Sequence, residues 1–155
     1  MNNKCIMIIA FLLLIIAGGA YKFILQGSTE VSTDGRTSIL LNPQERDLVL
    51  AEMRMFLSTV QQINTGIAEG DLKLVSKAAR EVGASAQAAV PGTLIGKLPL
   101  EFKKLCFDTH TKFDQLAMDN DDIEDGKHAL SQLSSLMQNC VACHEAYRID
   151  LEGQE

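Results

Sequence analysis

Apolar residues recur along most of the chain at intervals of three and four, and this spacing predicts amphipathic helices. The clearest stripe follows Asn42 and consists of Val49, Met53, Phe56, Val60, Ile63 and Ile67. Asn42 suits an N-cap, Pro43 suits a first helical turn, and Glu45 stands three residues after the cap, as in a capping box. The pattern therefore predicts a first helix over 42–69, ended by Gly70.

The same spacing predicts three further helices, over 71–90, 99–118 and 123–151. Pro91 and Gly92 stop the first of these, and a run of acidic residues before position 123 is expected to form a turn. No strand-like alternation is evident between the helices. Four amphipathic helices joined mostly by short connections predict an all-α fold, an antiparallel four-helix bundle.

An almost continuous apolar stretch, residues 5–25, precedes these helices. As a helix it would span roughly 31 Å, about one hydrocarbon thickness. We predict a transmembrane anchor over 1–25, because Phe23 and Leu25 continue the apolar run and Lys22 lies where it can reach the membrane surface. The alternative is a signal peptide cleaved after Ala20. Both predict export, either as a single-pass inner-membrane protein with its domain in the periplasm or as a soluble periplasmic protein.

Residues 26–41 are rich in Ser, Thr and Gly without a sustained period, which predicts a linker. The expected organisation is an anchor, this linker and one helical domain over 42–155. Two of the 14 basic residues lie in the anchor, so 12 basic and 20 acidic residues remain, a net charge of −8. This charge disfavours nucleic acid as a partner.

The segment Cys140-Val141-Ala142-Cys143-His144, in the last predicted helix, carries the clearest chemical signal. Two thiols at this spacing can reach two vinyl groups on one porphyrin edge, while the neighbouring imidazole reaches the iron. We therefore predict one covalently attached haem c. Cys140 and Cys143 would be its attachment sites, and His144 would be the proximal iron ligand.

Two other interpretations of the cysteine pair are weaker. A zinc site needs four ligands, and Cys106, His110 and His128 do not form a second closely spaced pair. A redox dithiol normally opens a helix after a strand, whereas this pair lies late in a helical chain. Cys5, in the apolar segment, and Cys106, in a predicted helix, are expected to be unpaired.

The motif C-x-x-C-H-x-x-Y-R, which ends in Tyr147 and Arg148, resembles the C-terminal part of the class II cytochromes c, the family of cytochrome c′ and its low-spin relatives. The resemblance covers about 42–151. It implies a haem inside the bundle, with the last helix on its proximal side and the first helix on its distal side, and it leaves a homodimer open. Arg148 would lie near a haem propionate or the proximal edge, with a solvated arginine as the alternative.

The resemblance also bears on the sixth iron ligand, because low-spin members of the family use a methionine of their first helix. Met53 lies on the apolar stripe of that helix, whereas Met55 points away from it. We therefore predict coordination by His144 and Met53. His110 as the ligand, or no sixth ligand at all, are the alternatives.

Together these features predict a membrane-tethered monohaem cytochrome that carries single electrons between redox partner proteins in the periplasm. Its acidic surface would steer basic partners. Without a sixth ligand, the resemblance implies instead a five-coordinate haem that binds nitric oxide or carbon monoxide, as cytochrome c′ does. A peroxidase needs distal acid–base groups. No Arg/His pair is placed for that role, so we expect no enzymatic activity.

Overall fold

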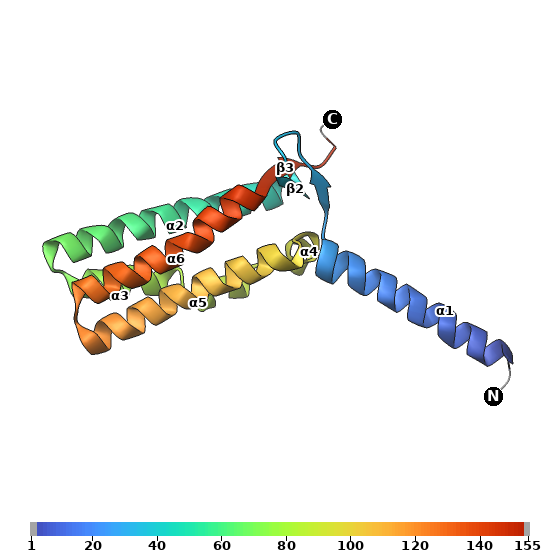
Figure 1. Ribbon diagram of the computed structural model, residues 1–155, viewed down its shortest axis with the longest axis horizontal. Coiled ribbons are helices and arrows are strands. Elements are labelled where there is room, and N and C mark those ends of the chain that lie inside the picture. Colours follow the sequence, from blue (N-terminus) through green and yellow to red (C-terminus); the bar gives the residue numbers. More distant parts are fainter. Residues whose placement is uncertain (1–2, 154–155) are drawn as a thin grey trace.

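The computed structural model describes residues 3–153 and is mostly helical (Figure 1). In chain order its elements are α1 (Asn3–Ala20), η1 (Tyr21–Gln26), β1 (Thr29–Val31), β2 (Thr37–Leu41), α2 (Pro43–Glu69), α3 (Leu72–Glu81), η2 (Ala84–Ala89), α4 (Gly92–Lys97), α5 (Leu100–Ile123), α6 (Gly126–Ala146) and β3 (Tyr147–Leu151). Helix α2 packs against α3 and α6, and α5 packs against the same two helices. These four helices therefore surround a common interior, and α1 extends away from them (Figure 1).

The prediction of the first helix is confirmed by α2. The Asn42 side chain accepts a hydrogen bond from the Glu45 backbone N–H at 2.9 Å, and the Glu45 carboxylate accepts one from the Asn42 N–H at 3.0 Å. Glu45 also accepts a hydrogen bond from Lys97 Nζ at 2.6 Å. Glu45, the second residue of the capping box, therefore connects the start of α2 to the end of α4.

The second predicted helix is shorter than expected, because α3 ends at Glu81 and residues 84–89 form the separate 3₁₀ helix η2. The Asp114 carboxylate on α5 accepts a hydrogen bond from the Ala84 N–H at 2.8 Å, which caps this new helix. A side chain at Gly83 would collide with Asp114. Because Asp114 is 30 residues away along the chain, local periodicity gave no sign of this break.

The third predicted helix is longer than expected, because α5 continues through the acidic residues that were predicted to form a turn. Asp121 pairs with Ser76 and Arg80 of α3, and the Asn120 amide donates to the Leu72 carbonyl at 2.7 Å. These contacts stabilise the helix to Ile123, and the turn begins at Glu124, whose φ of 52° is left-handed.

The structure corrects the predicted linker and the end of the last helix. Strands β1 and β2 lie within 26–41, and β3 replaces the expected helix over 147–151. β2 is the central strand, antiparallel to β1 and parallel to β3. Ile39 and Leu41 of β2 are fully buried, so this segment belongs to the folded domain. β2 has only five residues, without alternation of apolar and polar side chains, and its parallel partner β3 lies more than 100 residues later, so the sequence pattern did not reveal it.

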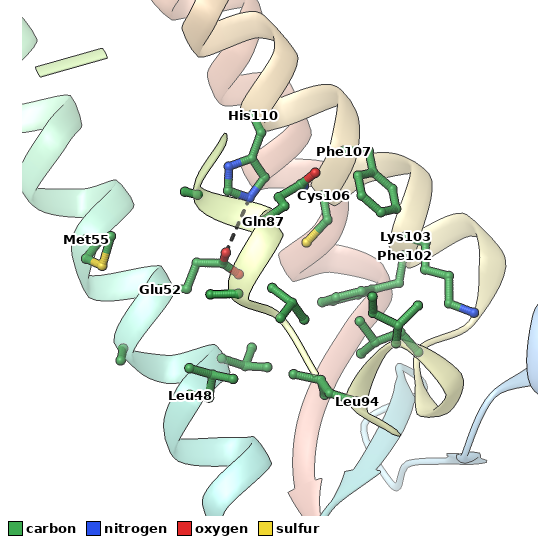
Figure 2. A pocket seen from close by; sticks show the side chains of 17 residues that line it. Leu48, Glu52, Met55, Gln87, Leu94, Phe102, Lys103, Cys106, Phe107 and His110 are labelled. Carbon is green, nitrogen blue, oxygen red and sulfur yellow. Dashed lines mark ion pairs between the residues drawn. The ribbon is translucent and has the colours of Figure 1, made fainter. Parts of the chain in front are cut away.

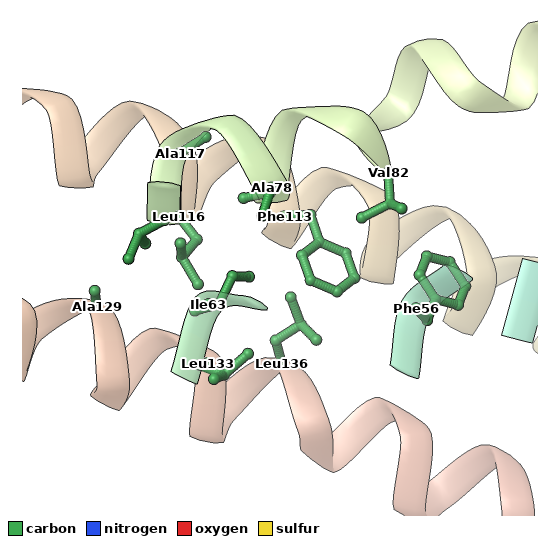
Figure 3. Packing of buried hydrophobic residues seen from close by; sticks show 12 residues of the cluster. Phe56, Ile63, Ala78, Val82, Phe113, Leu116, Ala117, Ala129, Leu133 and Leu136 are labelled. Carbon is green, nitrogen blue, oxygen red and sulfur yellow. The ribbon is translucent and has the colours of Figure 1, made fainter. Parts of the chain in front are cut away.

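Buried side chains form two clusters at different levels of the domain. The larger lies between the four packed helices, where Ile63, Phe113 and Leu136 converge with their neighbours (Figure 3). The smaller joins the sheet to α4 and to the starts of α2 and α5, and it consists of Ile39, Leu41, Val49, Leu94, Leu98 and Phe102. Cys143 packs against the smaller cluster, so the cysteine motif lies at that end of the domain.

Helix α1 and η1 together form one apolar helix, Asn3–Gln26, which is long and apolar enough to cross a membrane. Its last turn contacts the domain, because Lys103 Nζ of α5 donates to the carbonyl oxygens of Phe23 and Ile24 at 3.1 and 3.3 Å. Gly27 follows with a φ of 68°, and a Cβ there would lie 2.3 Å from the Lys97 carbonyl oxygen. The junction between apolar helix and domain therefore requires glycine at this position.

Candidate functional site

Four of the residues predicted to form the cofactor site lie around one pocket. Cys140, Cys143 and His144 from the last turns of α6 and Met53 from α2 all line a cavity of about 450 Å³. This volume falls within the range of small-molecule and cofactor sites, roughly 300–1,000 Å³. The structure thus places the cysteine motif opposite the helix that carries the predicted sixth ligand.

The walls of this cysteine pocket are largely apolar. The apolar side chains that line it, besides Met53, are Leu50, Phe56, Leu57, Val60, Leu105 and Met137. Leu57 and Met137 are also 72% and 42% exposed, so the rim of the pocket presents apolar side chains to solvent. Asn139, a polar residue of the wall, donates to Asp108 at 2.7 Å and to Thr109 at 3.2 Å. Its amide is engaged by protein. Arg54 is the charged residue of the lining besides His144, and the mostly apolar wall suits a mostly apolar ligand.

A smaller cavity of about 210 Å³ adjoins the cysteine pocket, and Met53, Cys143 and His144 line both. Arg148 of β3 and Arg36, at the turn before β2, line this second cavity. Arg148 is neither free nor fully solvated, because it pairs with Asp150 at 2.8 Å. Its guanidinium group is therefore held at the edge of the site, on the β3 side.

Arg36 is the site residue that sequence reasoning missed. Its guanidinium donates to the carbonyl oxygens of His144 and Tyr147, both at 3.3 Å, and pairs with Asp34 at 2.7 Å. It therefore binds the last carbonyl groups of α6, next to the cysteine motif. Arg36 lies in the segment that was interpreted as a linker. Only the recognition of strand β2, which begins at the next residue, could have placed Arg36 at the site.

The environment of the cysteines favours neutral thiols. Burial raises the pKa of Cys143 to about 11, with the neighbouring Cys140 as a smaller cause, and burial also raises the pKa of Cys140. Redox dithiols react as thiolates, and zinc binds thiolates. Burial thus disfavours a reactive redox dithiol, whereas zinc itself would deprotonate the thiols that it binds.

His110 does not line the cysteine pocket, so it is not positioned to bind an iron held there. It is 1% exposed and lines a separate cavity between α2, η2, α4 and α5 (Figure 2). Its Nδ1 lies 2.7 Å from the Val82 carbonyl oxygen, and its Nε2 lies 3.3 Å from Glu52 Oε1. Both ring nitrogens are thus engaged away from the cysteines. Met55 lines the same separate cavity, so Met53 is the methionine of α2 that faces Cys140.

Cys106, which was expected to be unpaired, is a free and partly buried thiol. It lines both the cysteine pocket and the cavity of His110. Burial, with Glu52 as a smaller cause, raises its pKa to about 12. Cys106 therefore stands as a neutral side chain in the wall between the two cavities.

Comparisons of the chain with protein-family models, with curated proteins and with solved structures found no match. The function is therefore inferred from the residues of the site themselves.

The His110–Glu52 pair should make stability depend on pH. Burial opposes the charged imidazole, but the Glu52 carboxylate and the Val82 carbonyl together raise the pKa of His110 above the ordinary histidine value. The pair therefore stabilises the fold fully below pH of about 6.5, and this contribution is lost as the pH rises through the folded-state pKa. Glu52→Gln should lower the His110 pKa and, at acidic pH, lower the free energy of unfolding by about 1–2 kcal/mol.

Histidine NMR titration and urea unfolding at several pH values measure the two effects. Glu69→Gln, at the exposed end of α2, is the matched control and should change neither quantity. An unchanged His110 pKa in Glu52→Gln would show that the pair does not govern this titration.

Proposed function

We propose that the chain is a c-type cytochrome in which Cys140 and Cys143 hold one haem covalently and His144 is its proximal iron ligand. The observation that carries this proposal is the shared pocket. A C-x-x-C-H segment lines an apolar cavity between packed helices, and a methionine thioether from the facing helix lines the same cavity. The apolar walls would exclude water from the ring.

Each protein group has a defined task in this proposal. The Cys140 and Cys143 thiols each add across a vinyl group, so that sulfur bonds to one carbon, hydrogen to the other, and nothing leaves. His144 supplies an imidazole nitrogen to the iron. When bound, the haem supplies a centre that gains and loses single electrons. Arg36 and Arg148 line the adjoining cavity, paired with Asp34 and Asp150, and would offer guanidinium N–H donors to the haem propionates.

Met53 is proposed as the sixth ligand, since it lines the cysteine pocket and His110 does not. A haem with two protein ligands carries electrons with little change in structure, which favours electron transfer between redox partner proteins as the function. The apolar rim at Leu57 and Met137 offers a contact surface, and the net charge of −8 beyond the anchor would attract basic partners.

We further propose that α2, α3, α5 and α6 are the antiparallel four-helix bundle of a class II cytochrome c. The order of packing around the interior supports this, as does the position of the cysteine motif on α6. The chain departs from a plain bundle in two respects. Helix α3 has only 10 residues, and η2, α4 and the sheet complete the end of the domain that lies near the cysteines.

The apolar helix Asn3–Gln26 is proposed as a retained anchor in the inner membrane, with the haem domain in the periplasm. Two contacts support retention. Lys103 binds the carbonyl oxygens of Phe23 and Ile24, and Gly27 fits closely against Lys97. The end of the helix thus packs against the domain at a specific position. A signal peptide that is cleaved off does not need such contacts.

Replacing both motif cysteines tests haem attachment. The double variant Cys140→Ser/Cys143→Ser should lose all haem that survives denaturing electrophoresis, because a serine hydroxyl does not form the thioether. Cys106→Ser is the matched control, since Cys106 lines the same pocket outside the motif, and it should keep the stained band. A stained band in the double variant would refute covalent attachment at these residues.

Met53→Ala tests the sixth ligand. The variant should change from low spin to high spin, lose the sulfur-to-iron charge-transfer band and show a lower reduction potential, because thioether ligation raises the potential. Met55→Ala, two residues away and facing the other cavity, should leave the spectrum unchanged. A Met53→Ala spectrum that stays low spin would exclude Met53, and a high-spin wild-type protein would support the gas-binding alternative.

The N-terminus of the mature protein tests the anchor. The native protein should remain with the membrane fraction after washing with salt and alkaline carbonate, because an apolar helix of this length holds a protein in a bilayer. N-terminal sequencing should find residues before position 20. A mature chain beginning at Tyr21 would identify the segment as a signal peptide.

A further inference from the structure

The cavity that contains His110 is distinct from the cysteine pocket and has a volume of about 190 Å³. Leu48 on α2, Leu94 on α4, and Phe102 and Phe107 on α5 form apolar walls (Figure 2). The His110–Glu52 pair lies in this wall as a polar group (Figure 2). An apolar cavity with a few convergent polar groups is the usual form of a site for a small, mostly apolar molecule.

The polar pair can hydrogen-bond a ligand. His110 Nδ1 faces the Val82 carbonyl oxygen, so Nδ1 carries hydrogen and donates. His110 Nε2 faces Glu52 Oε1, and the pair therefore shares a proton between imidazole and carboxylate. In the part of the chain that the structure describes, His110 is the one ionic partner of Glu52. The second carboxylate oxygen is thus open to a hydroxyl group. At 3.3 Å from Oε1, the Nε2–H can also be shared with a ligand carbonyl oxygen in a three-centre hydrogen bond.

The cavity lies beside the junction with the apolar N-terminal helix. Lys103 lines the cavity, and its Nζ binds the carbonyl oxygens of Phe23 and Ile24 at 3.1 and 3.3 Å. Ile95 of α4 also lines the cavity. The same helix contacts the junction, because Gly27 fits closely against Lys97 at the end of α4. A molecule dissolved in the bilayer around Asn3–Gln26 would therefore have a short path to this cavity.

The rim of the cavity is apolar as well. Leu48, Met55 and Phe107 line it and are each between 44% and 48% exposed. Exposed apolar side chains around a cavity that holds a carboxylate and an imidazole suit a lipid-soluble molecule with one polar end. They do not suit a charged metabolite, which would lose its hydration without compensation.

We propose that this cavity binds the ring of a membrane-dissolved quinone or quinol. The apolar walls contact the ring, and the His110–Glu52 pair hydrogen-bonds a ring oxygen. The tail leaves past the apolar rim toward the membrane. The volume of about 190 Å³ is slightly larger than a cavity of about 150 Å³ that binds one benzene ring, so it suits the ring and not the tail. Binding does not depend on the haem, since none of the residues proposed to hold haem line this cavity; electron exchange with a haem would rest on the function proposed above.

Photolabelling of the full-length, haem-loaded protein in detergent micelles tests the proposal. The probe is a short-tailed benzoquinone with a photoreactive azide, and labelled peptides are mapped by mass spectrometry. We expect label on peptides that contain Met55 or Phe107, removed by excess unlabelled short-tailed quinone. Ala89→Phe, which places a ring at the exposed edge of the cavity, and Glu52→Gln, which removes the charge without changing size, should each weaken labelling about tenfold.

Ala88→Phe is the matched control, because Ala88 is the exposed neighbour of Ala89 in η2 and does not line the cavity. It should label like the wild type. Equal labelling of Ala88→Phe and Ala89→Phe, or label confined to residues 3–26, would overturn the proposal. Haem stain of the same samples reports separately on covalent haem, so the failure of one proposal is not mistaken for the failure of the other.

Discussion

The parallel pairing of β2 with β3 is the constraint on which the candidate site depends. β2 ends at Leu41, directly before the cap of α2, and β3 begins at Tyr147, directly after α6. Pairing residues 37–41 with 147–151 therefore sets the first turns of α2 beside the last turns of α6. This register brings Met53 and the cysteine motif to one pocket, although they are about 90 residues apart in the chain.

The pairing also ends α6 two residues after the cysteine motif. β3 draws the chain out of the helix at Tyr147, whose ring packs against Phe102 with 5.4 Å between centroids. Arg36, at the turn into β2, then binds the carbonyl oxygens of His144 and Tyr147. Backbone pairing with β2, an aromatic contact from α5 and the Arg36 guanidinium group thus hold the end of the motif helix. A rigid frame of this kind is what a cofactor site needs, since its ligands must not move when the charge of the cofactor changes.

The sequence predicted those parts of the structure that depend on local pattern. The capping residues and apolar stripe of α2 gave its bounds closely, and the spacing of Cys140, Cys143 and His144 is visible in the chain itself. What was missed depends on contacts between distant segments. Strand β2 needs β3, the break after α3 needs Asp114, and the burial of His110 needs Glu52 from another helix. Periodicity within one segment carries no information about partners elsewhere in the chain, so it could not reveal Arg36 or the His110 cavity.

The central claim is that Cys140 and Cys143 carry one haem, and the intact mass of the native protein tests it most directly. Mass spectrometry of the full-length protein, purified from a host with cytochrome c maturation machinery, should give a mass one haem above that of the polypeptide. Digestion should place the added mass on the peptide that contains residues 140–144. A protein with the mass of the polypeptide alone, in which iodoacetamide alkylates both motif cysteines after denaturation, would contradict the account.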